Sequence, residues 1–241
     1  MSQSVACMRA VLAALLTVCL AGPALGFNMN KSITVGDGTQ TDGHSTVNGS
    51  ITIGRSAIVN GNLETVNGSI TVQDAATIRD AETVNGSVRL GAGVMAEDVS
   101  SVNGTIRLGE NVSLDGGISV VNGKIEAGRG SRIARSVENV NGEMQIEGTE
   151  IGGDLTTVNG DIWLTEGTLL RGDLVVEKPG GWGWGRDRRK PRIVIGEGVR
   201  VLGEIRLERE VELYVSDTAT VAGVSGKMSL DDAIRFSGPR P

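Results

Sequence analysis

The sequence predicts an all-β chain folded as a single-stranded parallel β-solenoid, a three-sided β-helix of about ten coils with 18–19 residues each. Three observations predict this fold. Two are patterns: a Val-Asn-Gly tripeptide recurs at a nearly constant spacing, and apolar residues alternate with polar ones after each copy. The third is composition, because 39% of the 241 residues are hydrophobic but only 2% are aromatic. The core must therefore be narrow and built from aliphatic side chains.

The repeat is marked by an asparagine that returns every 18 or 19 residues, starting with a degenerate first copy. These asparagines are Asn30, Asn48, Asn67, Asn85, Asn103, Asn122, Asn141 and Asn159. We expect Asn-Gly to form a corner, because glycine accepts a positive φ without strain and asparagine tolerates it better than most residues. Stacked asparagine side chains are also expected to hydrogen-bond into a ladder along the axis.

A strand follows each corner. Two inward columns of apolar residues lie two positions apart, as with Ile106 and Leu108, and the residue between them, here Arg107, is mostly polar. This period of two is that of a strand with one buried face. A third apolar column, with members such as Val99 and Ile118, closes each coil. Because so short a unit cannot bury its own apolar face, the copies must stack with parallel strands about 4.8 Å apart.

Residues 1–26 have the pattern of a secretory signal peptide. Arg9 precedes a short apolar run that ends in the small-x-small sequence Ala24-Leu25-Gly26. Both cysteines, Cys7 and Cys19, lie in this segment, so the mature chain is expected to carry no thiol. No other segment is long and apolar enough to cross a membrane. We therefore expect an exported product without a transmembrane segment, in the periplasm or at the cell surface.

The solenoid domain is predicted to occupy residues 27–225, with one inserted loop at residues 178–191. After the insertion, the strand pattern resumes at Ile193, and Val211-Glu212-Leu213 fits a last coil 18 residues further on. Residues 226–241 leave the repeat and are predicted to form a C-terminal cap or tail. A solenoid needs such a cap, because its ends present unpaired strand edges.

Several stretches resemble the rungs of bactofilins, which are polymer-forming bacterial scaffold proteins. They are Ala57–Leu63, Val112–Ile118 and Val199–Arg206, and the resemblance covers most of residues 30–215. The resemblance implies a right-handed, three-sided β-helix that assembles end to end into homo-oligomers through its solenoid ends, without enzymatic activity or bound nucleotide. Bactofilins are cytoplasmic, whereas this chain begins with a predicted export signal.

All three tryptophans gather near one group of basic residues, which predicts a binding site. Its candidate residues are Trp163, Trp182, Trp184, Arg186, Arg188, Arg189 and Lys190. Aromatic rings together with arginines suit wet, negatively charged interfaces, so the expected partner is an anionic glycan, a lipid head group or an envelope protein. The alternative interpretation is that the loop folds back and its rings cover Trp163 and Val194.

The remaining chemistry favours a non-enzymatic role. The formal net charge of −6 predicts no nucleic-acid partner. The lone His44 provides neither a metal site nor a nucleophile triad, so we expect no catalytic residue, no metal and no cofactor. We therefore expect a structural or adhesive β-solenoid of the cell envelope.

Two enzymatic alternatives remain open. One is a polysaccharide lyase or hydrolase that uses Asp154, Asp161 and Asp173, because β-helices host such enzymes. The other is a hexapeptide-type acyltransferase, whose left-handed coils of about 18 residues have a pattern that Ile53–Ala57 also fits.

Overall fold

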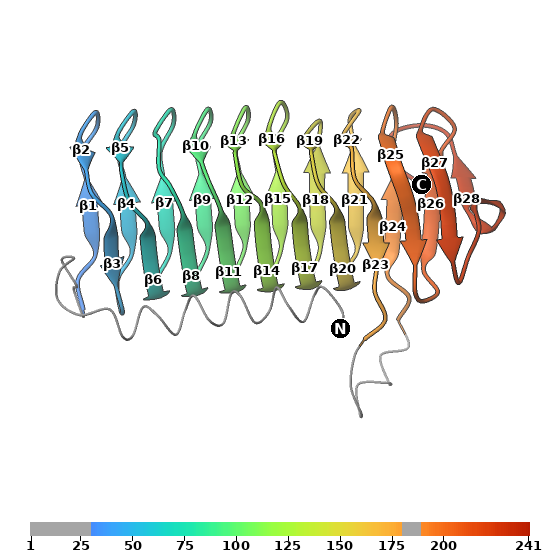
Figure 1. The fold of residues 1–241 in the computed structure, drawn as a ribbon, viewed down its shortest axis with the longest axis horizontal. Helices are drawn as coiled ribbons and strands as arrows, with labels where there is room; N and C mark the ends of the chain where they lie inside the picture. The colour runs from blue at the N-terminus through green and yellow to red at the C-terminus, as the bar shows by residue number, and fades with distance from the viewer. Residues whose placement is uncertain (1–29, 180–188) are drawn as a thin grey trace.

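The computed structural model describes residues 30–179 and 189–241, and within them the chain is almost entirely β-structure. Short strands from about ten successive coils stack side by side into a rod (Figure 1). Every strand pair is parallel and the register follows the sequence repeat, for example Ile106 opposite Val88 and Ile125. The predicted β-solenoid is confirmed.

The first ladder of strands carries the two apolar columns that follow each Asn-Gly corner. Its strands are β1 (Ile33–Val35), β4 (Ile51–Ile53), β7 (Ile70–Val72), β9 (Val88–Leu90), β12 (Ile106–Leu108), β15 (Ile125–Ala127), β18 (Met144–Glu147), β21 (Ile162–Thr165), β24 (Arg192–Ile195), β26 (Glu212–Ser216) and β28 (Ile234–Phe236).

The second ladder is made of very short strands. They are β2 (Gln40–Thr41), β5 (Ile58–Val59), β10 (Met95–Ala96), β13 (Ser113–Leu114), β16 (Arg132–Ile133), β19 (Glu150–Ile151), β22 (Leu169–Leu170) and the first half of β25 (Arg200–Leu207). Between β5 and β10, the coil contributes only isolated bridges through Thr77.

The third ladder carries the apolar column that closes each coil. Its strands are β3 (His44–Thr46), β6 (Leu63–Asn67), β8 (Ala81–Asn85), β11 (Val99–Asn103), β14 (Ile118–Asn122), β17 (Val137–Asn141), β20 (Leu155–Asn159), β23 (Leu174–Val176), the second half of β25, and β27 (Thr220–Gly226). The three ladders define three sides, and two of these sides meet in the long strand β25.

The coil is right-handed. In Figure 1 the chain rises along the rear ladder, crosses at the top and descends along the front ladders while it advances toward the C-terminal coils. This is the hand that connections between parallel strands almost always take.

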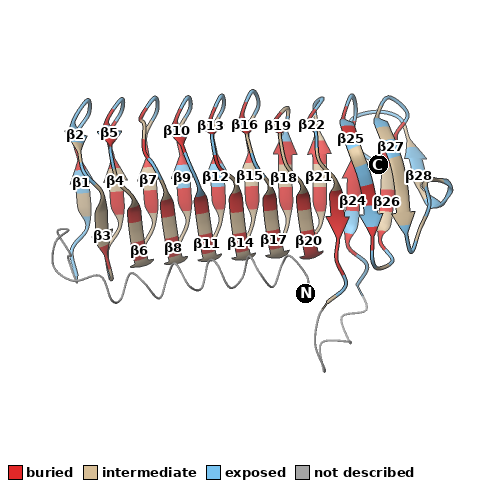
Figure 2. Cartoon of the chain, viewed as in Figure 1, coloured by how far each residue is buried: buried red, intermediate tan, exposed pale blue. Residues whose placement is uncertain are grey.

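The core is a continuous aliphatic column along the axis of the rod, drawn as buried positions in Figure 2, and it ends before the outermost strands β27 and β28. The predicted inward residues Ile106, Leu108 and Val99 are 0–3% exposed. The second inward position of the third ladder is instead mostly polar, which the apolar pattern did not predict. The hydroxyls of Thr65, Thr83 and their equivalents are buried and donate to glycine carbonyls of the preceding coil, at 2.9 Å and 3.0 Å for these two.

The predicted asparagine ladder is confirmed. From Asn48 to Asn159, each side-chain nitrogen donates to the side-chain oxygen of the asparagine one coil earlier, at 2.8–3.1 Å. Seven such bonds connect eight coils, so every amide in the interior of the ladder both donates and accepts. The ladder ties the corners together by side-chain contacts, in addition to the backbone pairing of the strands.

We expected glycine after each asparagine because the corner would need a positive φ, but the structure shows a different reason. Of these glycines, only Gly142 has a positive φ, of 135°. A Cβ added at Gly68, Gly86, Gly104 or Gly123 would instead lie 1.8–1.9 Å from the carbonyl oxygen of the glycine one coil earlier. Glycine is therefore required because adjacent backbones approach too closely for any side chain.

Positive φ values occur instead at the turn after the first ladder. One left-handed residue recurs there in most coils, and it is not always glycine, since Ser56, Ala75, Asn111 and Glu166 have φ values of 54–57°.

The last coil differs from the sequence prediction by two positions. Ile193 lies opposite Ile162, as expected, but its partner in the following coil is Leu213 rather than Val211. The step is therefore 20 residues, because the corner between β25 and β26 is longer than an Asn-Gly corner. Beyond it, Leu230–Asp232 form a 3-10 helix (η1) and β28 pairs with β26.

Replacement of Gly86 by alanine tests the corner geometry. The new Cβ would meet the Gly68 oxygen at 1.9 Å, so the coils must move apart, and we expect a loss of about 3 kcal/mol in the free energy of unfolding. Gly223→Ala is the matched control, because its nearest neighbour atom would be 3.7 Å away. Urea unfolding followed by far-UV circular dichroism measures both variants. Equal midpoints would contradict this explanation of the glycines.

Candidate functional site

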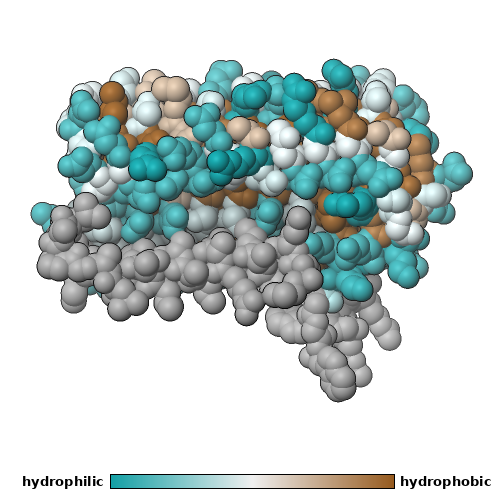
Figure 3. All heavy atoms as spheres, viewed as in Figure 1, coloured by the Kyte–Doolittle hydropathy of each residue, from teal (hydrophilic) through white to brown (hydrophobic). Residues whose placement is uncertain are grey.

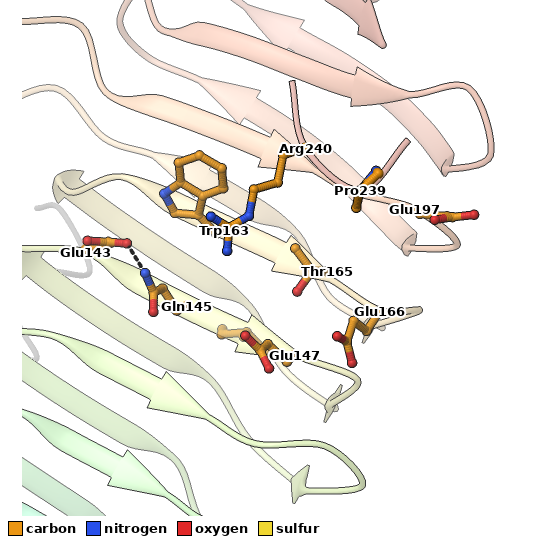
Figure 4. A pocket seen from close by; sticks show the side chains of 10 residues that line it. Glu143, Gln145, Glu147, Trp163, Thr165, Glu166, Glu197, Pro239 and Arg240 are labelled. Carbon is orange, nitrogen blue, oxygen red and sulfur yellow. Dashed lines mark hydrogen bonds between the residues drawn. The ribbon is translucent and has the colours of Figure 1, made fainter. Parts of the chain in front are cut away.

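A groove of about 560 Å³ lies on the outer face of the first ladder, over the C-terminal half of the rod (Figure 4). Its aromatic residue is Trp163 of β21, which is half-buried and lies in register between Gln145 of β18 and Val194 of β24. In earlier coils this outward column carries small polar or charged residues such as Thr52 and Arg107. The column thus changes from polar to aromatic and aliphatic near Trp163.

The walls of the groove are acidic. They include four glutamates, Glu143, Glu147, Glu166 and Glu197. Glu147 ends strand β18, whereas Glu166 and Glu197 occupy equivalent turn positions after β21 and β24. Arg129 pairs with Glu166, and hydrogen bonding to this guanidinium lowers the pKa of Glu166. Lys124 pairs with Glu143 at 3.3 Å, and the four carboxylates together give the groove an acidic lining.

The C-terminal tail supplies the one basic residue that lines this groove among the described residues. After β28, the hydroxyl of Ser237 donates to Asp217 at 2.6 Å, and Gly238 turns the chain with a φ of 96°. Pro239 and Arg240 then lie over the groove, and the Arg240 side chain extends toward the indole of Trp163 (Figure 4).

The sequence interpretation grouped Trp163 with Arg189 and Lys190, but these basic residues do not line its groove. They lie at the base of the inserted loop, where Arg189 pairs with Asp161 and Lys190 pairs with Glu210 at 2.8 Å. The other predicted site residues lie outside the described part of the chain. These are Trp182, Trp184, Arg186 and Arg188.

Arg209, which the sequence analysis missed, closes the asparagine ladder. Its guanidinium donates to the side-chain oxygen of Asn159 at 2.7 Å and to the carbonyl of Val158 at 3.2 Å. A third bond, of 3.2 Å, reaches the carbonyl of Arg189 at the end of the inserted loop. Lys178 would be the next ladder residue by register, but the insertion starts there. Arg209 therefore satisfies the last amide oxygen and holds the returning end of the loop.

The aspartates considered for catalysis have structural contacts. The side chains of Asp154 and Asp173 each accept a backbone N–H from the next coil at 2.8 Å, at the bend between the second and third ladders. Asp161 lies at a different corner, where it accepts the N–H of Arg192 at 2.9 Å and pairs with Arg189. The three carboxylates are therefore not brought together in one site.

A second acidic surface lies on the third ladder, where Glu64 of β6 and Glu82 of β8 are register partners. Burial raises the pKa of Glu82, and the negative charges of Glu64, Asp80 and Asp98 raise it further. Burial likewise raises the pKa of Glu64. Near the N-terminal end, burial also lowers the pKa of His44, whose ring lies 3.2 Å from the hydroxyl of Thr41.

The face visible in Figure 3 is mainly hydrophilic, with more apolar side chains toward the C-terminal coils. Among the residues that the structure describes, no group of acidic, histidine or cysteine side chains has an arrangement suited to a metal ion. No helix within the same residues has the length and apolar character of a membrane span.

Comparison of the chain with protein-family models, with curated proteins and with solved structures gave no match. The resemblance to bactofilins therefore stays a prediction, and the function has to be argued from the fold and its surface.

Glu82→Gln tests the pH dependence of stability. Because the folded-state pKa of Glu82 is raised, ionised Glu82 destabilises the fold once the pH exceeds the ordinary glutamate value of 4.5, and the protonated form carries no such penalty. We expect the variant to unfold at a higher temperature than the parent at pH 7 and at nearly the same temperature at pH 3.5. A lower melting temperature of the variant at pH 7 would contradict the assignment. Glu138→Gln, on the same outward column, is the control.

Proposed function

We propose that this chain is an exported, non-enzymatic β-solenoid that serves as a structural or adhesive element of the cell envelope. The observation that carries the proposal is the asparagine ladder, which runs unbroken through eight coils. Together with the buried hydroxyls and the bend aspartates, it commits the polar side chains of the corners to contacts between coils. Such a surface suits a stiff spacer better than a catalytic cleft, which needs convergent polar groups free to meet a substrate.

Self-association through the solenoid ends is part of the proposal. In the described residues, β1 pairs with β4 alone, so its outer edge has unpaired backbone groups. At the other end β27 and β28 are the outermost strands, and Met228, Leu230 and Ala233 pack against the core there. Open strand edges favour pairing with another chain unless they are covered, so the N-terminal edge is the better candidate for assembly.

The two enzymatic alternatives have less support. Hexapeptide acyltransferases have left-handed coils, whereas this solenoid is right-handed. A carboxylate-based lyase or hydrolase needs acids that converge on a substrate, whereas Asp154 and Asp173 each accept a backbone N–H from the next coil.

The envelope role depends on export and on the inserted loop, and one experiment tests both. In a bacterial host, we expect the full chain to lose about residues 1–26 and to appear in the envelope fraction. A variant in which an Asn-Gly turn replaces residues 178–191 should keep its melting temperature, because β23 and β24 belong to ladders that continue on either side. If the loop mediates adhesion, this variant moves to the soluble fraction.

An uncleaved chain in the cytoplasm would contradict the proposal. So would release of sugar products from a panel of charged and neutral polysaccharides by the purified chain, because a structural element performs no turnover. As a control for the loop replacement, Arg200→Ala changes an exposed basic residue of β25 that is not in the loop and should leave envelope retention unchanged.

A further inference from the structure

The groove at Trp163 differs from the rest of the first ladder in its outward surface. Before it, the outward column carries short or charged side chains, and some pair between coils, as Arg107 does with Glu126. From the groove onward the column carries Trp163, Val194 and Tyr214, and of these Trp163 lines the groove. Val194 is only 1% exposed although it points outward, and the Arg192 guanidinium lies over the Tyr214 ring at 5.5 Å from its centre. An aromatic and aliphatic strip has therefore formed on a face that is otherwise polar.

Carboxylates border this strip. Glu166 and Glu197 occupy equivalent turn positions in successive coils, and Glu147, the register partner of Thr165, lies one position earlier in the coil before them. The stacking of coils thus brings together residues up to 50 positions apart. Within the described part of the chain, no salt bridge of 4.0 Å or less engages Glu147 or Glu197. An aromatic face next to carboxylates suits a guanidinium group. The guanidinium can stack on the ring while its N–H groups donate hydrogen bonds to the carboxylates.

The chain places one of its own guanidiniums there. Arg240 lines the groove and points toward Trp163 in Figure 4, yet no salt bridge in the described residues holds it. The tail is anchored upstream, where the Ser237 hydroxyl donates to Asp217. The Arg240 side chain thus lies in a site of matching charge without a fixed contact, so another segment can replace it.

We infer that this groove is a binding site for an arginine-bearing polypeptide segment of a partner protein, and that the tail residues Pro239 and Arg240 occupy it in the free chain. The inference goes beyond the proposed structural role and does not depend on it, because the solenoid could serve as a structural element whether or not the groove binds a partner. The ligand has the opposite charge from the anionic partners predicted for the inserted loop. Intramolecular occupation lowers the apparent affinity for the partner, since the tail competes at a high effective concentration.

The experiment measures binding of a fluorescent peptide, Gly-Pro-Arg-Pro-amide, by anisotropy with the full chain and its variants. Arg240→Ala should bind the peptide about tenfold more tightly than the parent, because it removes the competing guanidinium. Arg235→Ala is the matched control, since it removes the same charge from the exposed strand β28 and should bind like the parent.

Further variants identify the groove as the place of binding. In the Arg240→Ala background, Glu147→Gln with Glu197→Gln should weaken binding about tenfold, and Trp163→Leu should weaken it as well. Added salt should weaken binding in the Arg240→Ala chain, and a peptide with lysine in place of arginine should bind less tightly. Far-UV melts check that each variant is folded.

The inference is overturned if Arg240→Ala binds no more tightly than Arg235→Ala, or if folded variants at Glu147, Glu197 and Trp163 bind as well as their background. Preference of the Arg240→Ala chain for an acidic glycan over the arginine peptide would overturn it too. None of these outcomes bears on export or envelope retention, so failure of the groove and failure of the proposed function are distinguishable.

Discussion

The close approach of each coil to the next is the constraint on which the rest of the structure depends. Parallel pairing holds adjacent backbones about 4.8 Å apart, and the chain returns to that spacing after 18 to 20 residues, or after 31 where the inserted loop intervenes. At the Asn-Gly corner the backbones pack so closely that an added Cβ would lie 1.9 Å from a carbonyl oxygen. Glycine makes this approach sterically possible, and asparagine fills the adjacent position with a hydrogen-bonding ladder. The same spacing lets the buried hydroxyls and the aspartates of the bends hydrogen-bond to the backbone of a neighbouring coil.

The regular Asn-Gly corners and the candidate binding groove at Trp163 lie in different parts of the rod. Through eight coils the corners are equivalent, and the ladder ends at Asn159, where the inserted loop starts and Arg209 takes over the contact. The groove at Trp163 and the tail that covers it belong to this same C-terminal region. This arrangement predicts a structural rod that contacts its partners near one end.

The fold was predictable because the same pattern of inward and corner residues recurs in each coil of the repeat. The inward columns, the asparagine ladder and the place of the insertion all follow from register alone. The site was less predictable, because the residues that line the groove come from several stacked coils and from the C-terminal tail. The sequence interpretation placed Trp163 with Arg189, yet its groove is lined by glutamates from three coils and by Arg240. The equivalent turn positions of Glu166 and Glu197 were visible in the repeat, whereas the path of the tail and the reach of Arg209 had no local signal.

Spin-label distances along one outward column test the stacked rod most directly. With both cysteines of residues 1–26 replaced by serine, nitroxides are attached to cysteines introduced at Glu64 and, in turn, at Ser119, Thr156 and Arg206, which lie three, five and seven coils away by register. At about 4.8 Å per coil, electron double resonance should give mean distances of about 14, 24 and 34 Å. The 31-residue step that contains the inserted loop should add no more than any other coil. Distances that stop rising with coil number would contradict the solenoid.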